Sequence, residues 1–169
     1  MVKPWKERGS NILNRESVYD LATVEETQKI GFILGKLVFG SSVILCQGDL
    51  GAGKTSLAQG VAKGMGINEE ITSPTFVIIK EYTSGNLPFY HMDLYRMENP
   101  EAIYELGFDD YLYGQGVTFI EWAEKTPNLL MPKEYLLVQI TFCGTGRQIK
   151  LRAHGALYED MLKEMPKCI

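Results

Sequence analysis

The sequence predicts an α/β domain in which helices flank a mixed parallel and antiparallel sheet. A glycine-rich loop at residues 48–55 lies between an apolar β-type run and a helical pattern, which is the order strand, loop, helix. Two pairs of β-rich runs are each separated by a turn of hairpin length, which predicts antiparallel strands as well. The 169 residues, of which 45% are hydrophobic, suit one domain with a proper core.

The first elements are a short strand and a helix. We expect the polar residues up to about Arg15 to be loosely held and residues 16–21 to form the strand. Thr23 and Glu26 form a capping-box pattern, with Thr23 as the helix N-cap. The helix then continues toward Gly40, which we expect to end it, and its apolar positions have helical spacing: Ile30, Ile33, Leu34, Leu37 and Val38.

The centre of the chain contains the strand and helix around the glycine-rich loop, followed by a hairpin. We expect the strand at residues 42–47 and the helix from residue 55 onward. Two β-rich runs, 75–82 and 87–95, are separated by the turn-forming residues 83–86. This spacing predicts that the two runs pair antiparallel.

The last third of the chain predicts two helices and three strands. Residues 99–101 read Asn-Pro-Glu, which is typical of a helix start with a cap, a proline at the first position and an acidic first turn. An apolar strand at 117–121 follows. Strands at 135–142 and 148–152 form a second hairpin, and a helix at 156–164 ends the pattern.

Composition narrows the class of function and the compartment. A net charge of −4 argues against a protein that grips nucleic acid alone. No apolar run reaches the length of a membrane span and no signal-peptide pattern follows the first charges, so we expect a cytoplasmic protein without membrane contact.

Cys46, Cys143 and Cys168 lack metal-site spacing and are expected to be reduced thiols. His91 and His154 lie far apart, which favours structural or surface roles.

The glycine-rich loop predicts the chemistry. Gly48–Thr55 reads G-D-L-G-A-G-K-T and fits the phosphate-binding P-loop pattern G-x-x-x-x-G-K-[ST]. Its glycines let backbone N–H groups approach phosphate oxygens, and the helix that follows adds a positive N-terminus. Lys54 is placed to reach the terminal phosphates and Thr55 to ligate Mg²⁺. The chain is therefore predicted to be a single P-loop NTPase-type domain over residues 1–169.

A carboxylate at the end of an apolar strand usually helps to hold the Mg²⁺ ion of such a site. Two carboxylates fit this description, Glu121 after residues 117–120 and Asp93 after residues 89–92. Spacing does not decide between them. One could serve the metal while the other orients the attacking water.

The arginines help to separate the classes of P-loop protein. Nucleotide kinases bring several arginines into the site, whereas Arg96 is the only arginine between the P-loop and the last hairpin. Arg96 could contact a phosphate or a partner, or it could equally pair with Glu98 or Glu101. The chain also lacks the N-K-x-D and D-x-x-G motifs of GTPases. These observations favour a slow ATPase that is coupled to a partner.

Further motifs follow the P-loop in a recognisable order. Residues 73–76 read S-P-T-F, residues 91–96 read H-M-D-L-Y-R and residues 120–122 read I-E-W. Their order and spacing closely resemble the TsaE (formerly YjeE) family, the ATPases of bacterial tRNA threonylcarbamoyladenosine synthesis. The resemblance runs from about Leu21 to about Arg152. The three blocks are far more specific than the P-loop alone.

The resemblance implies a function. It implies a Mg²⁺-dependent ATPase, slow alone, that docks on the TsaD–TsaB heterodimer. That pair transfers a threonylcarbamoyl group to the adenosine beside the anticodon in tRNAs that read A-starting codons. ATP hydrolysis would support repeated turnover. The chain would reach tRNA indirectly, through the complex, and would be a monomer by itself.

The resemblance also implies site residues near the phosphates. Thr55 and Glu121 would ligate Mg²⁺, and Lys54, Asp93 and Glu121 would be catalytic, with Asp93 as a catalytic or switch acid. The residues that hold the phosphates would be Leu50, Gly51, Ala52, Gly53, Lys54 and Thr55.

Other residues would border the rest of the nucleotide. Trp122 would lie close to it, and Thr23 together with the turn at Gly146 and Arg147 would border the base or ribose. The loop at residues 73–75 would sense the nucleotide. Simpler structural roles are also open, since Thr23 can serve only as a cap and Trp122 only as a core residue.

Two rival functions remain open at this point. A stand-alone kinase would yield a phosphorylated acceptor in place of free phosphate. A nucleotide-gated binding module would keep its function when hydrolysis is blocked and binding is preserved.

Overall fold

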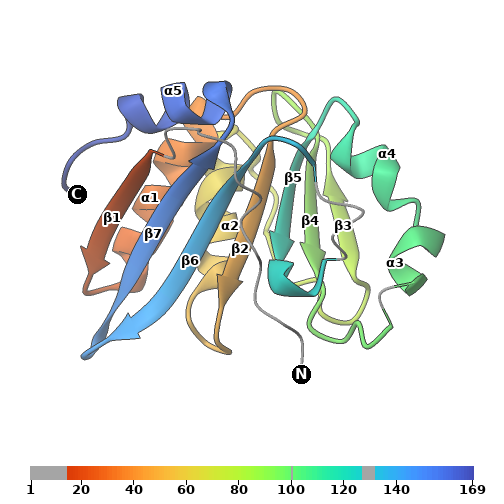
Figure 1. The fold of residues 1–169 in the computed structure, drawn as a ribbon, viewed down its shortest axis with the longest axis horizontal. Helices are drawn as coiled ribbons and strands as arrows, with labels where there is room; N and C mark the ends of the chain where they lie inside the picture. The colour runs from red at the N-terminus through yellow and green to blue at the C-terminus, as the bar shows by residue number, and fades with distance from the viewer. Residues whose placement is uncertain (1–14, 100, 127–131) are drawn as a thin grey trace.

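One seven-stranded sheet with the order β1-β7-β6-β2-β5-β4-β3 forms the centre of the protein (Figure 1). The computed structural model describes residues 15–99, 101–126 and 132–169. The elements are β1 (Glu16–Leu21), α1 (Val24–Leu37), β2 (Val43–Gly48), α2 (Lys54–Gly64), β3 (Ile79–Tyr82), β4 (Phe89–Asp93), α3 (Glu101–Glu105), α4 (Phe108–Leu112), β5 (Val117–Glu121), the 3₁₀ helix η1 (Ala123–Lys125), β6 (Tyr135–Cys143), β7 (Gly146–His154) and α5 (Ala156–Glu164).

The neighbouring strands β6, β2, β5 and β4 run parallel. Antiparallel pairings add β7 and then β1 at one side of these strands and β3 at the other. The carboxyl ends of the parallel strands therefore share one edge, the lower edge in Figure 1. β2 lies between β6 and β5 although neither is adjacent to it in sequence. In α/β sheets, ligands bind at the carboxyl edge where the strand order changes in this way. The predicted mixed α/β architecture is confirmed.

Local sequence signals explain where several elements begin. The Thr23 hydroxyl accepts a hydrogen bond from the Glu26 N–H at 3.2 Å, and the Glu26 carboxylate accepts one from the Thr23 N–H at 3.3 Å. This confirms the predicted capping box at the start of α1. The predicted strands at residues 16–21 and 117–121, both hairpins and the helix at 156–164 are also confirmed.

Two predicted boundaries were wrong. The strand predicted from residue 75 begins only at Ile79, because the Ile78 N–H donates to the Pro74 carbonyl at 2.7 Å and closes a turn. The helix predicted to reach Gly40 ends at Leu37, where the chain becomes extended. Helix α4 was not predicted. Residues 1–14, which we expected to be loosely held, lie outside the described residues. The same holds for the proline at position 100, which we expected at the start of a helix.

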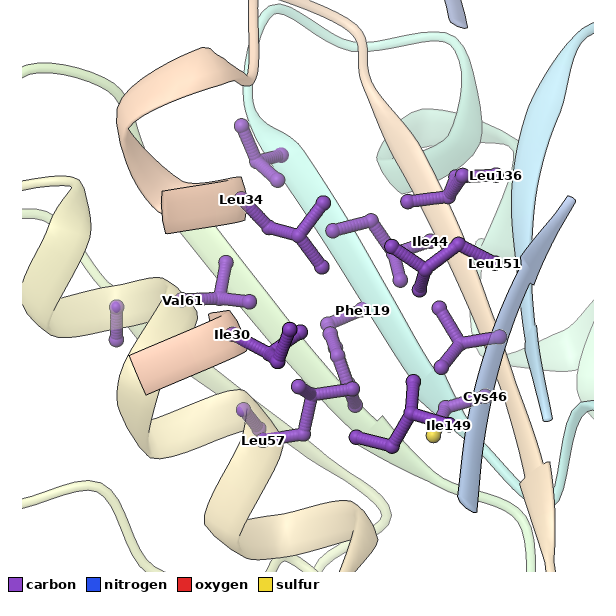
Figure 2. Close-up of a cluster of buried hydrophobic side chains, with 14 of the residues drawn as sticks. Ile30, Leu34, Ile44, Cys46, Leu57, Val61, Phe119, Leu136, Ile149 and Leu151 are labelled. Atoms are coloured by element: carbon purple, nitrogen blue, oxygen red, sulfur yellow. The ribbon is translucent and has the colours of Figure 1, made fainter. Parts of the chain in front are cut away.

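Apolar side chains form two clusters, one on each face of the sheet. Helices α1, α2 and α5 pack on one face, and α3 and α4 pack on the other beside β2, β5 and β4. Fully burying one large aliphatic or aromatic side chain stabilises a protein by roughly 1.5–3 kcal/mol. Figure 2 shows side chains of α1 and α2 pointing toward those of the sheet: Ile30, Leu34, Leu57 and Val61 opposite Ile44, Cys46, Phe119, Leu136, Ile149 and Leu151.

Glycines let α1 and α2 approach each other at backbone distance. A Cβ atom at Gly31 would lie 2.4 Å from the Leu57 carbonyl oxygen, and one at Gly60 would lie 2.2 Å from the Gln28 carbonyl oxygen. Gly35 and Gly64, one turn further along, form a second contact of the same kind. Because α2 begins at the P-loop, this contact helps to fix the position of the loop.

The substitution Gly31→Ala tests this contact. Alanine favours an isolated helix by about 1 kcal/mol over glycine, but here overpacking should cost about 1–3 kcal/mol and lower the free energy of unfolding. Chemical denaturation measures the change, with Lys29→Ala on the exposed side of the same helix as control. A Gly31→Ala protein as stable as the wild type would contradict the close packing.

Candidate nucleotide-binding site

The P-loop connects β2 to α2 at the carboxyl edge of the sheet. Gly51 has φ 77° and Gly53 has φ 112°, and such left-handed conformations favour glycine over residues with a Cβ. Between them, Ala52 is fully buried. The loop therefore has the backbone geometry that its glycine pattern predicts, and it ends at the N-terminus of an eleven-residue helix.

Lys54 is held by groups on both sides of its ammonium. The Nζ atom donates to the Gly48 carbonyl at 2.6 Å and to the Asp49 carbonyl at 2.8 Å. It also lies 3.9 Å from the centre of the Trp122 ring, as a cation–π contact requires. The side chain is only 5% exposed, so the positive charge has a fixed place beside the loop.

Glu121 connects the P-loop helix to the neighbouring strands. Its Oε1 atom accepts a hydrogen bond from Thr55 Oγ1 at 2.8 Å and contacts His91 Nε2 at 2.8 Å. Glu121 ends β5 and is almost fully buried. The carboxylate therefore joins α2, β4 and β5 at one point.

Asp93 lies next to Glu121 because the two residues are register partners in the parallel strands β4 and β5. Its Oδ2 atom accepts from Ser73 Oγ at 3.2 Å and Thr75 Oγ1 at 2.5 Å, and its Oδ1 atom accepts from the Tyr95 N–H at 2.9 Å. The second strand-end carboxylate therefore holds the loop that precedes β3.

These groups surround a cleft of about 330 Å³. Its lining includes most of the site residues expected from the sequence: Leu50, Gly51, Gly53, Lys54, Thr55, Asp93, Glu121 and Trp122, together with Ser56, Ser73, Thr75 and Tyr95. Four expected residues lie outside this lining: Ala52, Thr23, Gly146 and Arg147.

Arg147 approaches the P-loop from the last hairpin. Its Nε atom donates to the Ala52 carbonyl at 3.1 Å, and Nη2 donates to the Gly51 carbonyl at 3.4 Å. Gly146 packs closely against the backbone of Leu21, so the hairpin also meets the segment before α1. The hairpin thus supports the P-loop from outside the cleft.

Comparison with known proteins agrees with this geometry. A family model described as "Threonylcarbamoyl adenosine biosynthesis protein TsaE" matches residues 21–149. This chain belongs to the TsaE family. The match covers the P-loop, both strand-end carboxylates and Trp122.

Individual TsaE relatives extend the agreement to most of the chain. A Nostoc protein is 42% identical over 147 residues, which cover 84% of this chain and 89% of the relative. A Bacillus subtilis protein is 43% identical over 144 residues, covering 85% and 89%. Both are named "tRNA threonylcarbamoyladenosine biosynthesis protein TsaE". The crystal structure of Bacillus subtilis YdiB superimposes with a TM-score of 0.80 at 37% identity, covering 91% of this chain and 96% of that one.

Trp122 adopts a left-handed backbone conformation, with φ 58°, directly after Glu121. Its ring lies 4.9 Å from the Tyr95 ring and under the Lys54 ammonium. Ile78, the residue directly before β3, has φ 68°. Non-glycine residues in this region cost about 1–3 kcal/mol and cluster at functional sites. Trp122 is therefore both a partly buried packing residue and part of the lining of the TsaE cleft.

The sequence did not show the contact of His91 with Glu121, and it left the contact of Arg96 open. His91 is fully buried, which agrees with the expected structural role, and it contacts Glu121, which spacing did not indicate. The alternation of side chains along β4 was the available signal, because His91 and Asp93 are two residues apart and share a face. The Arg96 guanidinium lies 4.5 Å from the centre of the Phe76 ring.

The oxygen atoms of Thr55 and Glu121 suit a magnesium ion. Mg²⁺ prefers oxygen ligands and is usually bound by one or two carboxylates together with water and substrate phosphates. The described part of the chain contains no cluster of three or more acidic, histidine or cysteine side chains that could hold a metal alone. A site that shares its metal with a nucleotide fits these residues.

The three cysteines are free thiols, as expected, and burial raises the pKa of Cys46 well above its ordinary value. Cys46 is therefore a small core residue.

Among the described residues, no helix has the length and apolar character needed to cross a membrane.

Glu124 lies in η1, is half-buried and interacts electrostatically with the P-loop residues Lys54 and Asp49. Loss of solvent around its carboxyl raises the pKa above the ordinary 4.5, Lys54 opposes this effect and Asp49 adds to it. Its buried Oε2 atom has no hydrogen-bond partner among the residues that the structure describes. Compared with the unfolded chain, the folded protein therefore stabilises the ionised form of this carboxyl less well than the protonated form.

The substitution Glu124→Gln tests this. The folded-state pKa of Glu124 is raised, so its carboxyl contributes favourably to the stability of the fold at pH values below the unfolded pKa of about 4.5. This contribution is lost as the pH rises through the raised pKa. The variant should melt at a higher temperature than the wild type at pH 7.5, and the gain should disappear near pH 4. Thermal unfolding at both pH values measures this, with exposed Glu164→Gln as control. An equal gain at both pH values would contradict the assignment.

Proposed function

We propose that this chain is the Mg²⁺-dependent ATPase subunit of tRNA threonylcarbamoyladenosine synthesis, slow alone and coupled to a TsaD–TsaB heterodimer. The observation that carries the proposal is the meeting of Lys54, Thr55, Asp93 and Glu121 at one cleft. The chain belongs to a family named for this pathway. The tRNA substrates are those that read A-starting codons, modified at the adenosine next to the anticodon.

The P-loop binds the phosphates of ATP through residues 50–55. Lys54 contributes its positive charge, and Thr55 and Glu121 hold Mg²⁺, which neutralises charge on the phosphate oxygens when bound. Asp93 acts as the catalytic or switch acid. Its hydrogen bonds to Ser73 and Thr75 support the idea that this loop senses the nucleotide.

The base and ribose lie beyond the phosphates, with Trp122 close to the nucleotide. Trp122 supports this placement because it lines the cleft. Thr23, Gly146 and Arg147 border the nucleotide from the first helix and the last hairpin. Arg147 binds the P-loop carbonyls from outside the cleft, so it would meet only a base or ribose that extends beyond the cleft.

The loops around the cleft present exposed apolar side chains that suit contact with a protein partner. Leu50 in the P-loop is 72% exposed and Phe76 in the loop before β3 is 83% exposed. Val77, which follows Phe76, and Tyr95, which follows β4, are also exposed. Exposed apolar groups of this kind mark interaction surfaces when they gather at a site. The acidic chain, with a net charge of −4, acts in the cytoplasm as a monomer by itself and reaches tRNA through its partner.

A stand-alone kinase is the second candidate and has less support. Kinases of small molecules clamp two phosphorylated substrates with arginines. Among the described residues, no arginine lines the cleft, and Arg147 binds the loop carbonyls from outside.

The variant Lys54→Ala tests the proposal. It should lose productive ATP binding, because the fixed positive charge beside the P-loop is removed. Titration calorimetry measures binding, and multiple-turnover threonylcarbamoylation by TsaD, TsaB and the adenylate-forming enzyme measures function. Lys63→Ala, on the exposed side of the same helix, is the matched control and should behave as the wild type.

Wild-type affinity and turnover in Lys54→Ala would refute the role of the P-loop. Turnover that does not depend on the wild-type chain would refute the assignment to the pathway. A phosphorylated acceptor in place of free phosphate would favour the kinase.

A further inference from the structure

We propose that His91 is a positioning residue that holds the Glu121 carboxylate against Thr55 in the geometry needed to bind Mg²⁺. This inference rests on the proposed function of the cleft. It begins from the 2.8 Å contact between His91 Nε2 and Glu121 Oε1. A carboxylate oxygen in this contact accepts, so the Nε2 atom carries the hydrogen.

The surroundings of His91 fix the direction of its ring. The side chain is fully buried, and its ring centre lies 6.1 Å from that of Phe89 and 5.8 Å from that of Phe119. The ring is perpendicular to Phe119, with an interplanar angle of 83°. A packed ring of this kind has little rotamer freedom, so its N–H points at Glu121 at no further entropic cost.

The second ring nitrogen of His91, Nδ1, indicates that the residue has a role beyond packing. Nδ1 is buried and has no hydrogen-bond partner in the described part of the chain. A buried polar atom without a partner costs stability, so packing alone would favour an apolar ring at this position. The contact that offsets this cost is the one to Glu121, which points to a role at the cleft.

Glu121 Oε1 receives two donors, the Thr55 hydroxyl and His91. With both donors on one oxygen, the orientation of the carboxylate plane is set from α2 and from β4. Outer partners that orient metal-binding groups commonly affect metal affinity or activity by about 10- to 100-fold when removed. His91 has the position of such a partner and is not expected to touch the nucleotide.

The test compares His91→Phe, which keeps a packed ring and removes the donor, with His91→Gln, which restores an N–H donor at similar reach. In the purified full chain, ATP hydrolysis is measured against Mg²⁺ concentration, and ATP binding is measured separately in EDTA. His91→Phe should need about 10- to 100-fold more Mg²⁺ for half-maximal hydrolysis. His91→Gln should recover most of the loss, and metal-free ATP binding should stay within about twofold in both variants.

The matched control is Thr118→Val in β5, the strand that also contains Glu121. It removes a partly buried hydrogen bond from Thr118 Oγ1 to the Tyr111 carbonyl of α4. It should leave the Mg²⁺ requirement unchanged. If His91→Phe does not fold, His91→Leu serves as the variant without a donor.

Two results would overturn the inference: a wild-type Mg²⁺ requirement in the variant without a donor, or a His91→Gln protein as defective as that variant. Both presuppose a wild-type chain that binds and hydrolyses ATP. A wild-type chain without ATP binding or hydrolysis would instead refute the proposed function itself.

Discussion

The hydrogen bond between Thr55 and Glu121 joins the two halves of the site. Thr55 belongs to the first turn of α2, and Glu121 is the last residue of β5. The bond can form only because β5 lies directly beside β2, whose end leads into the P-loop. The parallel register of β4 and β5 then places Asp93 next to Glu121. Strand order, more than any single side chain, determines which groups meet at the cleft.

The P-loop is held from several directions. The glycine contacts between α1 and α2 fix the helix that follows it, and Arg147 binds two of its carbonyls from the last hairpin. Lys54 is confined between loop carbonyls and the Trp122 ring. A phosphate-binding loop depends on backbone N–H groups that are already oriented before a ligand arrives, and these contacts provide that order.

The sequence was sufficient to predict elements with local signals. The capping box at Thr23, both hairpins and the strand before Glu121 are confirmed, because caps, turns and alternation are encoded by neighbouring residues. The contact of His91 with Glu121 and the return of Arg147 to the P-loop depend on residues 30 and 95 positions apart. Alternation along β4 places His91 and Asp93 on one face, but it does not identify a partner on another element, so both contacts required the fold.

The central claim is that Thr55 and Glu121 together hold a divalent ion on a nucleotide bound by the P-loop. A crystal structure of the chain grown with Mn²⁺ and a non-hydrolysable ATP analogue tests it most directly, since Mn²⁺ can be located by its anomalous signal. The claim predicts one ion that contacts the analogue's phosphates, the Thr55 hydroxyl and the Glu121 carboxylate. An ion bound elsewhere, or a nucleotide outside the cleft lined by Lys54, would contradict it.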